Sequence, residues 1–209
     1  HGVNRGKGAA LDTGFKYVRD KQYEFVITMD GDGQHVAEDI PKFVEAYRKG
    51  DCPVLIGNRM ANPGAMPLVR RLTNRFMSRL LSRRIGQVVP DTQNGYRLYS
   101  RDSLPMAAVK SGRFAAESEI LMSLGRQGVR MGAVPTQVIY EDEKSKINPV
   151  VDTFRFFKML RDYDRQAADD DSREKKEEKA VIPPAERGSW PVIILRSMVG
   201  GVLMGLANL

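Results

Sequence analysis

The sequence predicts an α/β domain with a mainly parallel sheet that is flanked by helices. Segments with the apolar spacing of helices alternate with short segments rich in β-branched and aromatic residues over roughly the first sixty residues. One apolar segment also stops abruptly at Asp30 and Asp32. Polar groups are expected in this position where a buried strand reaches the carboxyl edge of such a sheet, because ligand sites lie there.

The first four elements follow one another in a regular order. A helical repeat of apolar residues covers residues 8–21, and a buried strand is expected at residues 23–30. A helix at residues 37–50 stops at Gly50, and a second strand covers residues 52–59.

The later elements are separated by proline and glycine. A loop at residues 61–67 precedes a strong helix at residues 68–84, and residues 85–95 are expected to be irregular. A strand, a helix, an extended stretch and a last helix are then expected at residues 95–100, 117–128, 131–140 and 149–163.

Composition divides the chain into three parts. Residues 1–164 form the α/β domain, residues 165–188 a charged, flexible linker with almost no large apolar side chain, and residues 189–209 an apolar helix. A membrane-spanning helix needs about 20 apolar residues, so a truncated span and a helix docked at an interface both remain open for the last part. Because the chain begins with His1 in what looks like the middle of a domain, we expect the α/β domain to be incomplete at its N-terminus.

The charge balance favours an anionic partner. The net charge is +7 and the isoelectric point is about 9.6, which suits nucleic acid, a membrane surface or a phosphorylated small molecule. The single cysteine, Cys52, excludes an intrachain disulfide, and with only two histidines it excludes a Cys/His zinc site. A reducing, cytosol-facing location is expected.

Asp30 and Asp32 are the strongest candidates for a metal site. Side chains two residues apart on an extended segment point the same way, and Gly31 allows the backbone to turn between them. Two carboxylates and the oxygen of Gln34 suit Mg²⁺ or Mn²⁺. A solvated turn is the alternative. A phosphohydrolase nucleophile is disfavoured, because such enzymes have Thr or Val in the place of Gln34.

Two basic features have both a functional and an ordinary interpretation. Lys7 lies between two glycines before a helix, which suits phosphate, although the spacing of a Walker loop is missing and a plain turn is equally compatible. The helix at residues 68–84 carries a stripe of arginines beside an apolar row. The stripe is Arg71, Arg75, Arg79 and Arg83, and the row is Leu72, Phe76 and Leu80. This is either a solvated face over a packed one or a surface for phosphates and lipid headgroups.

Three later motifs carry further polar groups. Glu117 and Glu119 are two residues apart on a helix and cannot share one face, so we expect only one of them to reach a site. The other motifs are a glycine turn and a charged loop, with Asp91, Asn94 and Arg97 in the first and Ser145 and Lys146 in the second.

Together these motifs resemble the family 2 glycosyltransferases, and within them the polyprenyl-phosphate sugar transferases of the dolichyl-phosphate mannose synthase type. The resemblance runs from about residue 4 to residue 160. The matching stretches are "NRGKGAALDTGF", "ITMDGDGQHVAEDIPKF", "LIGNRM", "DTQNGYRLY", "FAAESEIL" and "VPTQVIYEDEKSKI". The resemblance implies a GT-A fold with a Rossmann-like sheet, from which the family's first two nucleotide-binding strands are missing here.

The resemblance also implies roles for individual residues. Asp30, Asp32 and Gln34 would hold the metal and the donor diphosphate. Further contacts to the donor or its phosphates are implied for Lys7, Arg59, Arg71, Ser145 and Lys146. The residues implied at the reaction centre are Asp91, Arg97, Glu117 and Glu119. Of the basic residues, Arg59, Arg71 and Arg97 would bring the anionic donor and acceptor together against their repulsion.

The implied activity is metal-dependent, inverting transfer of a sugar from a nucleotide sugar to a polyprenyl phosphate. It would occur at the cytosolic face of a membrane, with the protein peripheral or anchored. A non-lipid acceptor and a non-catalytic membrane-docking module of the same fold are the alternatives. Nucleic-acid binding is disfavoured, because Phe76 is the only aromatic platform on the arginine-rich helix.

Overall fold

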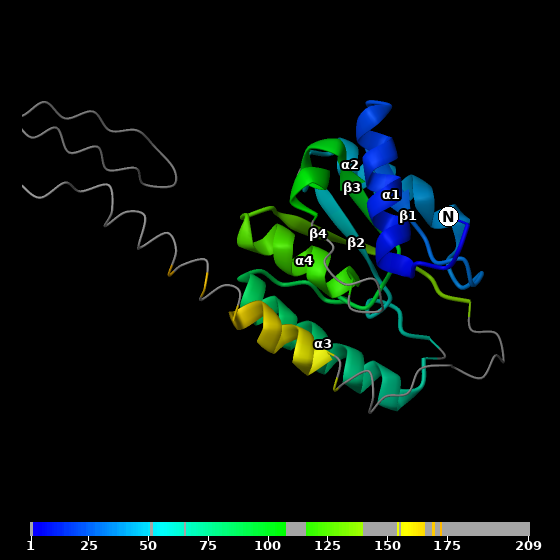
Figure 1. Cartoon of the computed structure of the whole chain (residues 1–209). Coiled ribbons are helices and arrows are strands. Elements are labelled where there is room, and N and C mark those ends of the chain that lie inside the picture. The colour runs from blue at the N-terminus through cyan, green and yellow to red at the C-terminus, as the bar shows by residue number, and fades with distance from the viewer. Residues whose placement is uncertain are drawn as a thin grey trace, which may run out of the picture. The chain divides into compact units, whose positions relative to one another are not determined.

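The structure is a computed structural model (Figure 1). It describes residues 2–50, 52–64, 66–107, 116–139 and 156–165, and residues 154, 169 and 172. The chain divides into two compact units, residues 1–161 and residues 162–209, and the sheet and the site described below belong to the first. The predictions for Ser145, Lys146 and the apolar helix at residues 189–209 lie outside the described residues.

A four-stranded sheet forms the centre of the first unit. Its strands lie in the order β1-β3-β2-β4, and their bounds are Phe25–Thr28 (β1), Val54–Asn58 (β2), Arg97–Ser100 (β3) and Met131–Pro135 (β4). β2 pairs parallel with β4, whereas β3 pairs antiparallel with both β1 and β2. The predicted α/β class and all four predicted strands are therefore confirmed.

β3 runs opposite to the other three strands, so the sheet is not fully parallel. Three strands run the same way, as predicted, but two of the three pairings are antiparallel because reversed β3 lies between β1 and β2. A helix that links parallel strands returns the chain to the opposite edge of the sheet. Here residues 86–96 bring the chain back to the edge where β2 ends, so β3 begins at that edge.

Helices cover both faces of the sheet (Figure 1). Leu98 and Tyr99 are successive residues of β3 and therefore point to opposite faces. Leu98 belongs to the same apolar cluster as Phe43 of α2 (Ile40–Arg48). On the other face, the rings of Tyr99 and of Phe15 in α1 (Lys7–Asp20) lie 5.1 Å apart.

Two further helices belong to the unit, α3 (Leu68–Ile85) and α4 (Ala116–Arg126). Two short 3₁₀ segments lie beside α2 and β3, at Ala37–Asp39 and Arg101–Met106. α3 ends at Gly86, whose φ of 71° is the left-handed conformation that glycine adopts without steric cost.

The packed face of α3 differs from the predicted one. Its buried residues are Asn74, Met77, Ser78, Leu81 and Ile85. Leu72 and Phe76 instead remain 56% and 53% exposed. Of the two interpretations of this helix, the structure therefore disfavours the one in which the apolar row packs inward. The polar residues Asn74 and Ser78 take part in the buried face.

Helical structure continues after residue 154. Residues 156–165 are helical, and the Phe157 ring lies 6.4 Å from that of Phe76 on α3. Asp169 and Ser172, in the second unit, are also helical although they lie in the segment predicted as a linker.

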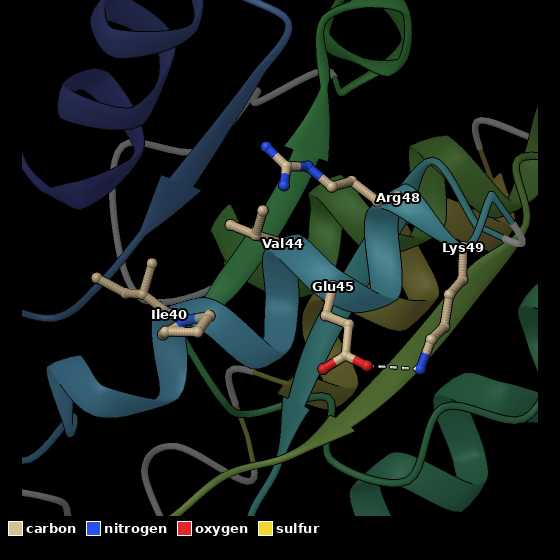
Figure 2. Close-up of a pocket in the computed structure, with 6 residues that line it drawn as sticks. Ile40, Val44, Glu45, Arg48 and Lys49 are labelled. Carbon is tan, nitrogen blue, oxygen red and sulfur yellow. Dashed lines mark hydrogen bonds and ion pairs between the residues drawn. The ribbon is translucent and has the colours of Figure 1, made fainter.

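An open hollow lies on the outer side of α2 (Figure 2). Its lining comes from this helix and from Lys49 directly after it, and Glu45 and Lys49 form an ion pair of 2.7 Å within it. None of the residues predicted for the site lies there. These residues instead gather at the edge of the sheet where β1, β2 and β4 end.

Candidate active site

One edge of the sheet collects polar residues from five elements. β1, β2 and β4 all end there, and β3 begins there, because β3 alone is reversed. Asp30 follows β1, Arg59 follows β2, and the loop at residues 91–96 precedes β3. Lys7 and Glu117 reach the same place from the first turns of α1 and α4.

Lys7, Asp30 and Glu117 form a cluster of charges, called here the lysine–carboxylate cluster. The Lys7 ammonium group donates to Asp30 Oδ1 and lies 2.6 Å from Glu117 Oε1. One cation is therefore shared by two carboxylates that lie far apart in the sequence. All three side chains are partly or largely shielded from solvent.

Gly95 allows the two carboxylates to approach one another. A Cβ atom at this position would lie 2.6 Å from Glu117 Oε1 and 2.7 Å from each carboxylate oxygen of Asp30. Any side chain at residue 95 would therefore occupy the space of the carboxylates. The glycine turn predicted from "DTQNGYRLY" forms the floor of the lysine–carboxylate cluster.

The charges in this cluster stabilise one another. His35 Nε2, 3.4 Å from Asp30 Oδ2, and the Lys7 ammonium hold the pKa of the Asp30 carboxyl well below its usual range, against the opposing effect of burial. Burial alone would lower the pKa of Lys7, but Glu117 and Asp30 outweigh it and raise this pKa. Both groups are therefore charged at neutral pH.

An aromatic stack supports the histidine. The rings of His35 and Tyr96 lie 5.0 Å apart, and the Tyr96 ring lies 4.6 Å from that of Phe43 in the core. Tyr96 also donates its hydroxyl to the backbone carbonyl of Val36 at 3.1 Å. The position of the histidine beside Asp30 is thus fixed by packing to the sheet.

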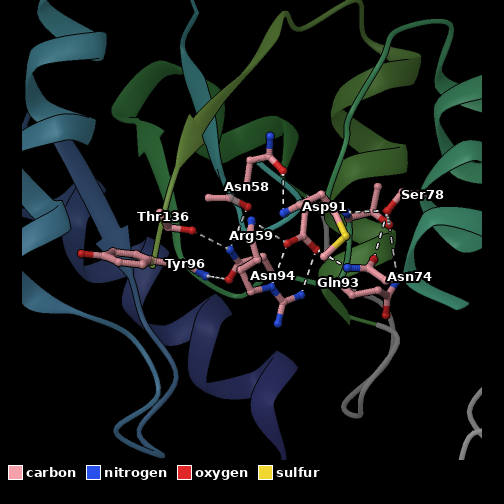
Figure 3. Close-up of polar contacts among 12 residues, drawn as sticks. Asn58, Arg59, Asn74, Ser78, Asp91, Gln93, Asn94, Tyr96 and Thr136 are labelled. Atoms are coloured by element: carbon pink, nitrogen blue, oxygen red, sulfur yellow. Dashed lines mark hydrogen bonds and ion pairs between the residues drawn. The ribbon is translucent and has the colours of Figure 1, made fainter. Parts of the chain in front are cut away.

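A second network holds the loop at residues 91–96 (Figure 3). Asp91 is buried and accepts hydrogen bonds from Arg59 Nε at 2.7 Å, Arg59 Nη2 at 2.8 Å and Asn74 Nδ2 at 2.8 Å. Burial would raise the pKa of Asp91, but the charge and hydrogen bonds of Arg59, with the Asn74 amide, lower it below the ordinary value. Asp91 is therefore a charged structural carboxylate.

The other end of this loop is held by an amide. Asn94 Nδ2 donates to the carbonyl of Gly57 at 2.7 Å, and its Oδ1 accepts from the backbone N–H of Tyr96 at 3.1 Å (Figure 3). In the middle, the backbone N–H of Thr92 donates to Ser78 Oγ on α3 at 3.0 Å. These contacts fix the backbone on both sides of Gly95.

Arg97 lies beneath the loop and is fully buried. Its guanidinium donates to the backbone carbonyls of Asn94, Thr92 and Glu117 at 2.7, 2.9 and 2.8 Å, and to the Tyr99 hydroxyl at 3.3 Å. The guanidinium therefore links the loop before β3 to the first turn of α4. This arrangement brings Glu117 to the floor formed by Gly95.

Comparison with known proteins identifies the family. A profile described as Glycosyl transferase family 2 matches residues 1–105, about half of the 209 residues. An uncharacterised protein of Methanocaldococcus jannaschii is 32% identical over 77% of this chain and 69% of its own length. The chain belongs to glycosyl transferase family 2. The prediction of a family 2 glycosyltransferase with an α/β fold of the GT-A type is thus confirmed.

Two relatives of this family 2 chain have informative names. It is 29% identical to a UDP-N-acetylglucosamine–dolichyl-phosphate N-acetylglucosaminyltransferase of Methanococcus voltae, over 68% of the chain and 59% of the relative. It is 29% identical to an undecaprenyl-phosphate mannosyltransferase of Micrococcus luteus, over 62% of the chain and 55% of the relative. The chain thus spans less than two thirds of either transferase.

The structure distributes the predicted site residues of this family 2 domain over distinct environments. Lys7, Asp30 and Glu117 come together, and of the two glutamates Glu117 is the one that reaches Asp30. Asp32 is exposed in the turn after β1, where its Oδ1 accepts from the backbone N–H of Gln34 at 3.1 Å. Glu119 lies further along α4 and is partly exposed.

The three predicted arginines are buried to different extents and make different contacts. Arg59 binds Asp91, and both are buried. Arg71 is less buried, but its Nε is shielded and has no hydrogen-bond partner among the described residues. Four hydrogen bonds from Arg97 go to protein groups, so its geometry favours a positioning role over the predicted contact with an anion.

Several residues of the site were not predicted from the sequence. Gly95 was expected only as a turn, and His35 was not expected beside Asp30. Asn74 and Ser78 were also missed, although uncharged polar residues spaced i, i+4 in an arginine-rich helix are a usable signal for a buried polar face. The contact between His35 and Asp30 has no such signal, because it depends on the path of the turn after β1.

The lysine–carboxylate cluster has the chemistry of a cation site. Within the described part of the chain, no three side chains of His, Cys, Asp or Glu come close enough to enclose a metal ion. Asp30 and Glu117 nevertheless already share one cation, the ammonium of Lys7, over the space left by Gly95. Two carboxylates suit Mg²⁺ or Mn²⁺, which commonly complete their coordination with water and substrate phosphate. The residues present therefore fit a divalent cation.

The stabilisation by Asp91 is expected to depend on pH in the acid range. Its pKa in the folded protein lies below the ordinary 3.8, so its contribution is complete above that pH and is lost as the pH falls further. The free energy of unfolding should be measured for the wild type and for Asp91→Asn from neutral pH down to about pH 2. We expect the difference between the two proteins to narrow at the acid end. A constant difference would contradict a charged Asp91 in the folded state.

Proposed function

We propose that this chain transfers a sugar from a nucleotide sugar to a polyprenyl phosphate at the cytosolic face of a membrane, with inversion at the anomeric carbon and with Mg²⁺ or Mn²⁺. The observation that carries the proposal is the lysine–carboxylate cluster at the carboxyl edge of the sheet in a family 2 chain. The names of the relatives from Methanococcus voltae and Micrococcus luteus support the acceptor class.

The carboxylates after β1 would hold the cation. Asp30 would do so with Asp32 and Gln34 of the exposed turn, and Glu117 offers a further carboxylate next to Asp30. When bound, the cation supplies electrostatic stabilisation of the negative charge that develops on the leaving nucleoside diphosphate. His35 and the stack beneath it fix the Asp30 side chain for this role.

The attacking group needs no general base. A lipid phosphate is already anionic near neutral pH, so its oxygen forms the new bond to the anomeric carbon while the bond to the diphosphate breaks and its electron pair leaves with the diphosphate. The charged state of Asp91 is consistent with a reaction without a general base. The Asp91 carboxylate is buried, bonded to Arg59 and not arranged to take up a proton.

Arginines would bring the two anions together against their repulsion. Arg71 is the best placed of the predicted ones, because its shielded Nε lacks a protein partner among the described residues. It lies in the first turn of α3, where the helix dipole also favours anions. Arg97 contributes indirectly by fixing the loop at residues 91–96.

The outer face of α3 supports membrane docking. We define it by its exposed apolar residues Leu68, Val69, Leu72 and Phe76 and its exposed arginines Arg75, Arg79 and Arg83. Phe157, also exposed, extends the apolar part beside Phe76. A contiguous exposed apolar surface rimmed by basic residues fits an anionic lipid surface. None of the described helices is long and apolar enough to span a bilayer.

Removing the apolar part of this face is expected to weaken lipid binding. The double variant Leu72→Ser, Phe76→Ser should bind phosphatidylglycerol vesicles at least about tenfold more weakly, because each side chain buries apolar area in the lipid. Tyr17→Ser is the matched control, since Tyr17 on α1 is 54% exposed, like Phe76 at 53%. Co-sedimentation with the vesicles measures the lipid binding of the double variant and of the control. Equal binding by the double variant and the wild type would contradict docking through α3.

A transfer assay tests the proposed function. The full chain is incubated with Mn²⁺, labelled nucleotide sugars and either a polyprenyl phosphate or a soluble sugar acceptor. We expect labelled lipid in the first case alone. Label on the soluble acceptor would favour the non-lipid alternative, and donor and lipid binding without turnover would favour the docking module. Either result would overturn the proposed reaction.

A further inference from the structure

The Lys7 ammonium group occupies the place where a divalent cation would be shared by Asp30 and Glu117. Its nitrogen bonds to Asp30 Oδ1 and lies 2.6 Å from Glu117 Oε1. We propose that Lys7 is the resident counter-ion of this carboxylate pair, and that a divalent cation must displace it. This inference rests on the proposed function. The cluster thus exists in two mutually exclusive forms, one closed by lysine and one open to the metal.

The two cations cannot share the pair. Oxygen ligands lie about 2.0–2.1 Å from Mg²⁺, so an ion held by both carboxylates would occupy the space that the ammonium group now fills. Two positive charges at such separations repel strongly in a partly shielded site. The floor at Gly95 leaves no second place below the carboxylates, because even a Cβ atom there would lie within 2.7 Å of their oxygens.

Lys7 has a route out of the cluster. Its side chain is 37% exposed, and it is the first residue of α1, directly after Gly6, whose φ is 86°. A long, flexible side chain at a helix N-terminus can turn to an anion nearby. The diphosphate of an arriving donor is such an anion, so the donor would stabilise the open form by accepting the displaced ammonium group.

The lysine therefore makes binding of the cation depend on the donor. Without a donor, the ammonium neutralises the two carboxylates and opposes the metal. With a donor, the ammonium gains a phosphate partner and the pair becomes available. Replacing Lys7 by a neutral residue should remove this dependence, so that the cation binds without nucleotide.

Mn²⁺ titration followed by electron paramagnetic resonance tests this inference without any transfer reaction. The full chain is compared as wild type, Lys7→Met, Asp30→Asn and Lys16→Met. Lys16 is the matched control, because it lies on the same helix and also pairs with a carboxylate, Asp12, at 2.7 Å. In the absence of nucleotide we expect Lys7→Met to bind Mn²⁺ at least about tenfold more tightly than the wild type and Lys16→Met to be unchanged.

Thermal unfolding gives a second measurement on the same proteins. Without metal, Lys7→Met leaves the carboxylates of Asp30 and Glu117 facing one another, and its melting temperature should fall. Mn²⁺ should raise this melting temperature more than that of the wild type. If Lys7→Met does not fold without metal, Lys7→Gln replaces it and the same two comparisons apply.

The outcomes separate this inference from the proposed function. In one outcome, Asp30→Asn abolishes Mn²⁺ binding, but Lys7→Met binds Mn²⁺ no more tightly than the wild type. This outcome would overturn the competition between Lys7 and the metal and leave the cation role of Asp30 intact. Mn²⁺ binding that is absent from the wild type and from both Lys7 variants would overturn the competition together with the cation role. Tighter binding by Lys7→Met supports the inference.

Discussion

Gly95→Ala is expected to slow sugar transfer strongly while the protein remains folded. The new Cβ would lie 2.6–2.7 Å from carboxylate oxygens of Glu117 and Asp30. These atoms are the ends of side chains, so the carboxylates move and the backbone does not. A displacement of about 1 Å in a catalytic arrangement costs about a hundredfold in rate, and we expect at least this loss in the transfer assay.

Gly31→Ala is the matched control for this prediction. Gly31 lies inside the Asp-Gly-Asp motif itself, but nothing comes within 4 Å of the Cβ that alanine would add, and its φ is not in the left-handed region. We therefore expect transfer within about twofold of the wild type. Circular dichroism verifies the folding of both variants. Full activity of Gly95→Ala would show that the approach of Asp30 and Glu117 over Gly95 has no role in the reaction.

Asp91→Asn is expected to destabilise the fold more than any exposed charge change. The substitution removes a buried carboxylate that binds Arg59 through two nitrogens and Asn74 through a third, and it leaves a guanidinium without its counter-ion. Breaking a buried ion pair in this way costs about 3–5 kcal/mol in free energy of unfolding. Chemical denaturation measures this loss.

Asp102→Asn provides the comparison for the buried pair. Asp102 is 93% exposed and lies 3.8 Å from Arg101, a geometry in which an ion pair contributes little. We expect its unfolding curve to overlay that of the wild type. If Asp91→Asn were equally harmless, the network around the loop at residues 91–96 would not be what holds this loop in place.

The helices and strands could be predicted because their sequence signals are local. A run of β-branched and aromatic residues identified the strand that ends before Asp30, and helical spacing identified α1 and α3. The placement of Asp30 at the carboxyl edge of the sheet followed from the same reasoning. Such patterns depend on a few neighbouring residues, so a single sequence contains them.

The pairing of charged residues was not predictable in the same way. Arg97 was expected to bind an anion, but it lies beneath the loop and donates to backbone carbonyls. Leu72 and Phe76 have helical spacing, but the face of α3 that packs inward is set by Asn74 and Ser78, which bond the loop and Asp91. These outcomes depend on residues far apart in the chain. The reversed direction of β3 likewise depends on the path of residues 86–96.

Transfer of labelled sugar to a polyprenyl phosphate by wild type and Asp30→Asn, at saturating Mn²⁺, tests the central claim most directly. The claim is that the carboxylate after β1 holds the cation that stabilises the departing diphosphate. We predict that Asp30→Asn is at least about a hundredfold slower than the wild type, while Asp102→Asn keeps the wild-type rate. A folded Asp30→Asn protein with the wild-type rate would contradict the claim.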